Sequence, residues 1–458
     1  MKCFSALPPV DKTWYHTTTM VKRIAMLTDN ADPLVPLGGH EAGGENVYVY
    51  ELAKALGRMG WTIDVYTRWS YPKTARIAKM GENVRVIRLE AGPVEFIPKE
   101  NLFPYMQAYI DSFCEYVNKN KLDYLLLHGN YYLSSWAAVQ LGKKLKIPVV
   151  STFHTLGVVK HKALNSHDPS PKDRIDKELE VMNGEDRLIA TSTVMKDEIT
   201  EFYKINPKKI TVIPGGVNLK RFSSLPQHLA RRILNINPNR IIILYVGRME
   251  RRKGIDTLLY AMAELGKMMP EKRKFLRCYI AGGEPRHRWY RGAENPDKIE
   301  RERLKKIVDE LGIKDMVRFI GGMNRENLPY YYSAADITVV PSYYEPFGLV
   351  PLESMACGTP VVASNTGGLK YTIKDGKCGY LVPPRDHKLF AAKMYVLLEN
   401  STIRKHFREN GMERVKRFFG WEAVASQMSS FYNDIIIENF WRQLFKKPVV
   451  PNGKNPPL

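Results

Sequence analysis

The sequence predicts an α/β protein with two Rossmann-like, doubly wound domains and a cleft between them. Its 458 residues are too many for one typical core and suit two domains of roughly 200 residues each. Short apolar runs alternate with helical patterns along the chain, which is the order of a parallel sheet covered by helices. Loops rich in Gly or Pro follow several of these runs, where a parallel sheet carries its ligand sites.

Composition and charge restrict the class of partner. Hydrophobic residues make up 44% of the chain and aromatic residues 11%, which excludes disorder throughout. The 69 Lys and Arg against 48 Asp and Glu leave a formal charge of +21, which favours anionic partners. The cations are scattered and no nucleic-acid motif occurs, so nucleic acid is not predicted. Phosphorylated small molecules and an anionic membrane surface fit the charge equally well.

The cysteines and the N-terminal residues predict a cytoplasmic protein. The five cysteines are far apart and include no C-x-x-C pair, which indicates free thiols in a reducing compartment rather than a zinc site or a disulfide framework. No apolar run approaches the roughly 18 residues of a membrane span. Residues 1–20 lack a signal-peptide pattern and are expected to be a disordered leader, with Met20 as an alternative start.

The first half reads as an N-terminal domain over residues 21–218. Its expected strands are residues 23–28, 61–67, 84–89, 124–127, 149–152, 186–190 and 209–213. Between the first two, a Gly-rich loop at 29–45 leads into a helix pattern at 47–60, and Gly44 allows backbone to approach a ligand phosphate. A paired glycine is also common in simple turns.

Four polar residues lie just past strands of this half. They are Lys99, Tyr131, Thr155 and Arg174, the last at the start of a helix. Cations supply charge and hydroxyls supply directed hydrogen bonds, so together they predict a phosphate pocket. Each alone could equally be an ordinary surface or structural residue. The domain boundary is expected at residues 215–235, where Pro, Ser, Gln and Asn accumulate.

The second half reads as another such domain over residues 236–418. Expected strands are residues 241–246, 275–280, 317–320, 337–340 and 361–363, and a basic insertion at 285–298 is expected to be a surface loop. After the first strand, GRMERRKG places Arg248 and Lys253 at a helix start, where they could neutralise a diphosphate. A solvated basic loop is the alternative.

The stretch EPFGLVPLESMACGTPVV, from residue 345, predicts a loop and a helix that begins near Gly348. Free N–H groups around Phe347, Gly348 and Leu349 make an anion site. Glu345 and Glu353 beside it suggest recognition of sugar hydroxyls, although either could be an ordinary first-turn carboxylate.

Glu345 and Glu353 resemble the E-x7-E signature of retaining glycosyltransferases with the GT-B architecture, family 4. The resemblance implies that Glu345 lies by the donor sugar, that Glu353 binds the ribose of a nucleotide sugar, and that Arg248 and Lys253 clamp its diphosphate. It further implies donor phosphate contact at Gly44, acceptor contact at Asn46, sugar contact at His154, and uracil contact around Gly322 and Met323. His154, Arg248, Lys253 and Glu345 would be the catalytic residues, with no metal and no cofactor besides the nucleotide sugar.

Within that family, Lys99, Tyr131, Thr155 and Arg174 resemble the acceptor-phosphate residues of inositol-phosphate glycosyltransferases, and sucrose-phosphate synthases share much of the frame. Asn130 and Asn218 depart from the family's usual His and Asp. The implied reaction is transfer of a hexosyl group from UDP-GlcNAc or UDP-glucose, with retention, to a phosphorylated polyol or sugar such as inositol phosphate. Fructose 6-phosphate and other sugar or lipid-linked acceptors are the alternatives. A homodimer and peripheral contact with an anionic membrane stay open as partners.

Residues 419–443 are expected to form a helix that returns to the N-terminal domain, as in the family, and residues 444–458 a disordered tail. Two non-enzymatic readings stay open. One is a nucleotide-sugar sensor without turnover, and the other is a protein whose charge serves nucleic-acid or membrane binding.

Overall fold

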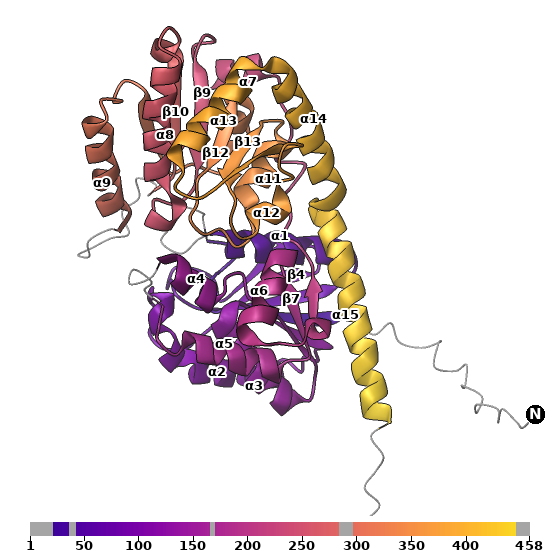
Figure 1. Cartoon of the computed structure of the whole chain (residues 1–458). Helices are drawn as coiled ribbons and strands as arrows, with labels where there is room; N and C mark the ends of the chain where they lie inside the picture. Colours follow the sequence, from indigo (N-terminus) through magenta and orange to yellow (C-terminus); the bar gives the residue numbers. More distant parts are fainter. Residues whose placement is uncertain (1–21, 36–42, 165–169, 284–295, 446–458) are drawn as a thin grey trace, which may run out of the picture.

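The computed structural model describes residues 22–35, 43–164, 170–283 and 296–445, which form two α/β domains stacked one above the other (Figure 1). The expected leader at 1–20 lies outside the described residues, as does most of the expected tail. Most of the basic insertion also lies outside them, but its last residues, 296–298, are the first turn of a helix rather than a loop. No helix among the described ranges is long and apolar enough to cross a membrane.

The N-terminal sheet has eight strands in the order β3-β4-β2-β1-β5-β6-β7-β8. The strands are β1 (Arg23–Leu27), β2 (Thr62–Arg68), β3 (Ile77–Gly81), β4 (Val84–Leu89), β5 (Leu126–Asn130), β6 (Val149–Thr152), β7 (Arg187–Ala190) and β8 (Ile210–Val212). The helices are α1 (Gly44–Arg58), α2 (Met106–Lys119), α3 (Tyr131–Leu145), α4 (Gly157–Leu164), α5 (Arg174–Gly184) and α6 (Thr193–Tyr203). Strand order reverses between β1 and β5, so the loops after these two strands flank the place where such sheets bind ligands.

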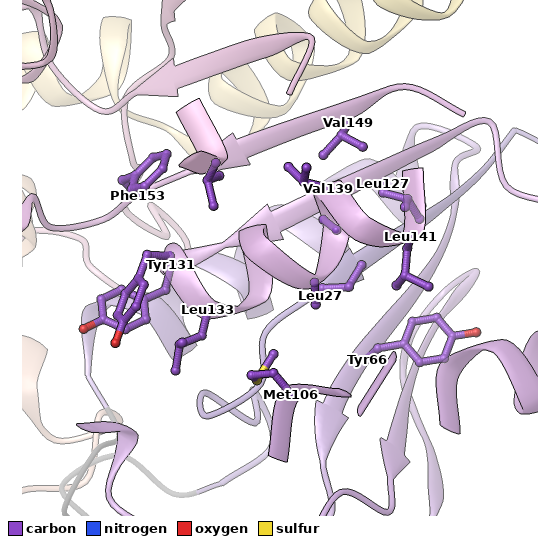
Figure 2. Packing of buried hydrophobic residues seen from close by; sticks show 14 of the residues in the cluster. Leu27, Tyr66, Met106, Leu127, Tyr131, Leu133, Val139, Leu141, Val149 and Phe153 are labelled. Carbon is purple, nitrogen blue, oxygen red and sulfur yellow. The ribbon is translucent and has the colours of Figure 1, made fainter. Parts of the chain in front are cut away.

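The core of this domain explains why the apolar runs predicted its strands. Figure 2 shows Leu133, Val139 and Leu141 of α3 packed with residues of neighbouring strands, including Leu127 and Val149. All five are buried among other apolar side chains, and parallel strands covered on both faces need such continuous apolar runs.

The C-terminal sheet has six parallel strands in the order β11-β10-β9-β12-β13-β14. They are β9 (Ile241–Val246), β10 (Leu276–Ala281), β11 (Val317–Gly321), β12 (Ile337–Val340), β13 (Val361–Ser364) and β14 (Gly379–Val382). The helices are α7 (Gln227–Ile233), α8 (Ile255–Met268), α9 (Pro296–Glu310), α10 (Leu328–Ala334), α11 (Leu349–Ala356), α12 (Leu369–Thr372), α13 (His387–Glu399) and α14 (Ser401–Phe418). Order reverses between β9 and β12, which places the loops after these strands at the second switch point. The predicted α/β class with two doubly wound sheets is confirmed.

The last helix, α15 (Trp421–Leu444), leaves the C-terminal domain and runs down the side of the N-terminal domain (Figure 1). The Trp61 Nε1 donates a hydrogen bond to the Ser429 Oγ at 2.9 Å, and the His128 Nδ1 and the Tyr432 hydroxyl lie 2.6 Å apart. These contacts anchor the helix to the first sheet.

The two domains meet through loops at the carboxyl ends of their strands. A Cβ built on Gly44, at the start of α1, would lie 3.7 Å from the Leu349 Cδ1 at the start of α11. The Leu156 N–H, after β6, donates to the Tyr344 hydroxyl, after β12, at 3.4 Å. The two switch points therefore face each other.

Candidate active site

Three of the four predicted acceptor-phosphate residues, Tyr131, Thr155 and Arg174, lie together at the edge of the N-terminal sheet. Arg174, at the first position of α5, donates through its Nη2 to the Thr155 Oγ1 at 2.9 Å and to the Thr155 carbonyl at 3.1 Å. Its guanidinium carbon lies 5.2 Å from the centre of the Tyr131 ring. A buried guanidinium with a hydroxyl and a tyrosine beside it has the chemistry of a phosphate or sugar pocket.

Arg174 is held in place by a buried carboxylate that the sequence analysis did not identify. The Arg174 Nε donates to the Glu178 Oε1 at 2.8 Å, and the side chains are 2% and 0% exposed. The Gly157 N–H donates to both Glu178 oxygens and the Tyr203 hydroxyl donates to one of them. The spacing of four residues from Arg174 is the signal that could have found this pair.

Tyr131 itself has a backbone conformation that L-residues rarely adopt. Its φ is +66°, directly between β5 and α3, and its side chain is buried. Such a conformation costs on the order of 1–3 kcal/mol and persists where the surroundings require it. Burial raises the pKa of its hydroxyl well above 10, although the Arg174 charge opposes this, so the hydroxyl stays protonated.

Lys99 lies in a single 3-10 turn, Lys99–Asn101, that precedes α2. The neighbouring Glu100 is one of the charges that act on Tyr131, which places this turn beside the same cluster. Lys99 is only half-buried, so its ammonium can reach a ligand.

Asn46, predicted as an acceptor contact, makes two hydrogen bonds within the N-terminal domain. Its Oδ1 accepts from the Gly43 N–H at 2.9 Å, and its Nδ2 donates to the Asp32 carbonyl at 2.9 Å. The side chain is buried and shapes the glycine loop that carries Gly44. Gly44 is exposed at the start of α1, where its N–H belongs to the free donors of a helix end.

His154 lies in the loop after β6, and its imidazole is neutral. Burial lowers its pKa to about 3. The Asn130 Nδ2 donates to the Leu27 carbonyl at 3.4 Å, which turns the Asn130 Oδ1 toward the His154 Nε2, 3.1 Å away. Because that oxygen can only accept, the Nε2 carries the proton and the Nδ1 is left as an acceptor.

On the facing domain, Glu250 binds two cations of the GRMERRKG loop. Its Oε1 lies 2.7 Å from the Arg248 Nη2, and its Oε2 lies 2.6 Å from the Arg252 Nε. Burial tends to raise the pKa of this carboxyl, but the charges of Arg252, Arg248, Lys253 and Lys99 hold it below its usual range. Arg252 has the largest effect of these four charges, and Lys99, from the other domain, has the smallest.

Lys253 and Glu345, predicted as separate catalytic residues, form an ion pair. The Lys253 Nζ donates to the Glu345 Oε2 at 2.6 Å, and both side chains are 15% exposed. Burial tends to raise the pKa of Glu345, but Lys253 and Arg252 lower it overall, so the carboxylate is ionised. Burial lowers the pKa of the Lys253 ammonium.

The helix α11 begins where the sequence predicted the anion site. Gly348 caps the helix with a φ of +97°, and α11 begins at Leu349. That φ favours glycine, and a Cβ there would also lie 2.8 Å from the end of the Leu369 side chain. Phe347 is buried, and Leu349 faces Gly44. The free N–H groups and positive dipole end of the helix thus point toward the other domain.

Glu353 is buried in α11 and separate from Glu345 in its contacts. The Tyr332 hydroxyl donates to its Oε2 at 2.9 Å, and the Arg325 Nη2 lies 3.8 Å from its Oε1. Burial raises its pKa, although Arg325 opposes this. Arg325 also lies 3.8 Å from Glu51 of α1, so it connects Glu353 to the N-terminal domain.

Gly322 and Met323 follow β11, at the carboxyl edge of the C-terminal sheet. Met323 is partly buried against the apolar cluster that contains Phe347. Both residues therefore lie on the side of the sheet where the nucleotide was expected.

Comparisons with known proteins agree with this arrangement. A family model described as Glycosyltransferase Family 4 matches residues 42–221, and one described as Glycosyl transferases group 1 matches residues 227–414. Between them they cover every strand of the two sheets except β1.

Two relatives and one solved structure show the extent of the similarity. The D-inositol 3-phosphate glycosyltransferase of Corynebacterium kroppenstedtii is 34% identical over 92% of this chain and 91% of its own length. D-inositol 3-phosphate glycosyltransferase 2 of Catenulispora acidiphila is 34% identical over 91% of this chain and 95% of its own. The structure of sucrose-phosphate synthase from Thermosynechococcus elongatus superposes with a TM-score of 0.82 at 37% identity, over 91% of this chain and 100% of that one.

Proposed function

This chain belongs to the GT-B glycosyltransferases of family 4 and is a transferase enzyme, and from that premise we propose that it moves a hexosyl group from UDP-GlcNAc or UDP-glucose to a hydroxyl of a phosphorylated polyol or sugar, such as inositol phosphate. The observation that carries the proposal is the hydrogen bond from the Leu156 N–H to the Tyr344 hydroxyl across the two domains. It brings the loop of Thr155, which binds Arg174, beside the loop of Glu345, which binds Lys253.

The C-terminal domain would hold the donor. Arg248 and Lys253 neutralise the charge that develops on the departing diphosphate, and the free N–H groups of α11 donate to its oxygens. Glu345 stays ionised and orients both the Lys253 ammonium and the sugar hydroxyls. Glu353, on the same helix, would accept from the ribose. In this proposal no divalent ion takes part, so a chelator should leave turnover unchanged.

The N-terminal domain would hold the acceptor. Arg174 binds the phosphate as a fixed fork because Glu178 fixes its other edge, and Lys99 adds a mobile charge. The neutral His154 accepts from a donor-sugar hydroxyl through its Nδ1. The acceptor hydroxyl attacks the anomeric carbon on the face that the diphosphate leaves, a phosphate oxygen takes its proton, and the configuration is retained. Closure of the domains excludes water from the donor.

A second acceptor, fructose 6-phosphate, is favoured by the close likeness to the sucrose-phosphate synthase structure. Both acceptors carry a phosphate and use the same pocket. A mass-spectrometric screen of UDP-sugars against inositol phosphate, fructose 6-phosphate and their unphosphorylated forms separates them, and NMR of the product gives the anomeric configuration.

The four described cysteines are free, and burial raises the pKa of Cys278 to about 12, so its thiol is unreactive. Free thiols suit the reducing cytoplasm, where we place this reaction.

Lys99→Ala tests the phosphate pocket. We expect the KM for the phosphorylated acceptor to rise about tenfold or more, because a charged hydrogen bond is lost, with a smaller change in kcat. Lys73→Ala, an exposed lysine of the same domain, is the control and should have no effect. Equal effects of Lys99→Ala on phosphorylated and unphosphorylated acceptors would remove the phosphate-pocket assignment while leaving the donor site intact.

A further inference from the structure

The end of α15 carries an exposed apolar stripe. The stripe consists of Ile437, Phe440, Trp441, Leu444 and Phe445, which are 53%, 55%, 50%, 59% and 72% exposed. Their spacing of three and four residues places them on one face of the helix. Trp441 and Phe445 stack on each other at 5.5 Å, so the aromatic rings form one continuous surface. Apolar surface gathered in this way marks an interaction site.

The face of α15 that contacts the protein is polar over these same turns. Glu438 lies 2.8 Å from Arg187, Arg442 lies 2.8 Å from Asp186, and the Gln443 Nε2 donates to the Lys146 carbonyl at 3.1 Å. Earlier turns do the opposite and bury apolar residues such as Tyr432 and Ile435. Over the last turns of α15 the contacts with the domain are therefore partly exposed ion pairs and a hydrogen bond, and the large apolar groups stay uncovered.

Exposed lysines lie on the same edge of the N-terminal domain as this stripe. The helix ends and loops that precede β5, β6 and β8 lie at the amino edge of the parallel sheet, opposite to the active site. Their exposed lysines are Lys119, Lys121, Lys143, Lys144, Lys146, Lys204 and Lys208. The exposed acids of these segments are Asp123 and Glu201, and the same edge also carries Glu180 and Asp186 before β7 and Glu438 on α15. The bond from Gln443 to Lys146 joins the stripe to this basic edge.

We propose that the apolar stripe and the basic edge together dock this enzyme on an anionic lipid bilayer. Trp, Phe and Leu side chains enter the interface, and lysines bind the acidic headgroups. A second copy of this chain fits less well, because a two-fold contact through the stripe would bring two basic edges together. Docking at the amino edge leaves the donor and acceptor sites free, so it goes beyond the proposed reaction and does not depend on it.

The experiment is co-sedimentation of the full chain with vesicles of phosphatidylcholine alone or mixed with phosphatidylglycerol, at low and high salt. The wild type should bind the anionic vesicles and lose binding as salt rises. We expect the double variant Trp441→Ser, Phe445→Ser to bind about tenfold less, since both anchors are lost. The double variant Lys143→Glu, Lys144→Glu should lose binding to a similar extent and flatten the salt dependence.

Controls on the other domain are Met268→Ser and Lys306→Glu, an exposed apolar residue and an exposed lysine. Both should bind vesicles like the wild type, and every variant should keep its glycosyl transfer to a soluble acceptor. Binding that ignores lipid charge, or that survives both double variants, overturns the proposal. So does a wild type that ultracentrifugation shows to be a dimer, if Trp441→Ser, Phe445→Ser makes it monomeric and no vesicle binding is seen.

Discussion

At the scale of single residues, the donor side depends on carboxylates that position cations. Glu250 binds Arg248 with one oxygen and Arg252 with the other, and its side chain is half-buried. A carboxylate shared by two guanidinium groups fixes both of them more firmly than either would be fixed by packing. Glu345 fixes a single cation, the Lys253 ammonium, through its Oε2.

Glu250→Gln tests that role. An amide cannot accept from two cations as the carboxylate does, so Arg248 should lose its alignment, and we expect kcat/KM for the donor to fall about tenfold to a hundredfold. Steady-state kinetics at varied donor concentration measures it. Glu271→Gln, on an exposed loop, is the control. If Glu250→Gln had wild-type kinetics, the guanidinium groups of Arg248 and Arg252 would be positioned without the Glu250 carboxylate.

The sequence identified the chemical type of the site residues but not their pairing. Arg248, Lys253 and Glu345 stand in loops after strands, so their place could be predicted from the order of the elements. That Lys253 pairs with Glu345 depends on two loops 92 residues apart, which no local pattern encodes. The hydrogen bonds of Asn46 to the Gly43 N–H and the Asp32 carbonyl could not be predicted either, because the glycine loop brings these partners together only when it folds.

At the scale of elements, the start of α8 shows how the backbone sets the cation loop. Gly254 has a φ of +65° and follows the 3-10 turn Arg251–Lys253. A Cβ there would lie 2.1 Å from the Pro341 carbonyl oxygen, so the loop after β9 touches the loop after β12. Only glycine permits this close approach.

Gly254→Ala should therefore destabilise the protein and displace Lys253. We expect a loss of about 2–4 kcal/mol in the free energy of unfolding, from backbone strain plus the clash. Gly376→Ala is a matched control, since Gly376 has a φ of +68° with nothing within 4 Å of the added Cβ. That variant should lose only about 1 kcal/mol, because it carries the strain alone. Urea unfolding measures both variants. If Gly254→Ala and Gly376→Ala lost the same free energy of unfolding, the contact with Pro341 would add nothing to the backbone strain.

Buried parallel strands could be predicted well, because each is a continuous apolar run. The edge strand β3 was missed, since its residues are largely exposed and it pairs with β4 alone. The predicted strand at 124–127 continues through His128, Gly129 and Asn130, which are polar or small yet buried. Their hydrogen-bond partners come from β1, β6 and α15, so local composition could not reveal them.

At the scale of the whole molecule, α15 ties the C-terminal domain to the N-terminal sheet through a buried histidine. The His128 Nδ1 faces the Tyr432 hydroxyl of α15 at 2.6 Å, and its Nε2 faces the Thr152 Oγ1 at 2.9 Å. Burial, with a smaller effect of His154, lowers the pKa of His128 to about 3.

This junction predicts a loss of stability in acid. The unfolded chain protonates His128 near its ordinary pKa of about 6.5, whereas the folded chain does so only near pH 3, so the free energy of unfolding should fall as the pH drops below about 6.5. The slope from this one group approaches about 1.4 kcal/mol per pH unit. His128→Gln should flatten the slope measured by thermal unfolding, whereas Thr152→Val should lower stability and keep the slope. If His128→Gln left the pH dependence of the free energy of unfolding unchanged, the lowered pKa of His128 would be contradicted.

The central claim is that cations of the C-terminal domain hold the nucleoside diphosphate, and calorimetric titration of UDP tests it most directly. Arg248→Ala and Lys253→Ala should each weaken UDP binding about tenfold to a hundredfold, since each removes a charged hydrogen bond to phosphate. Arg251→Ala, in the same loop with a side chain that is 62% exposed, should bind UDP like the wild type. Wild-type affinity in both Arg248→Ala and Lys253→Ala would contradict the account.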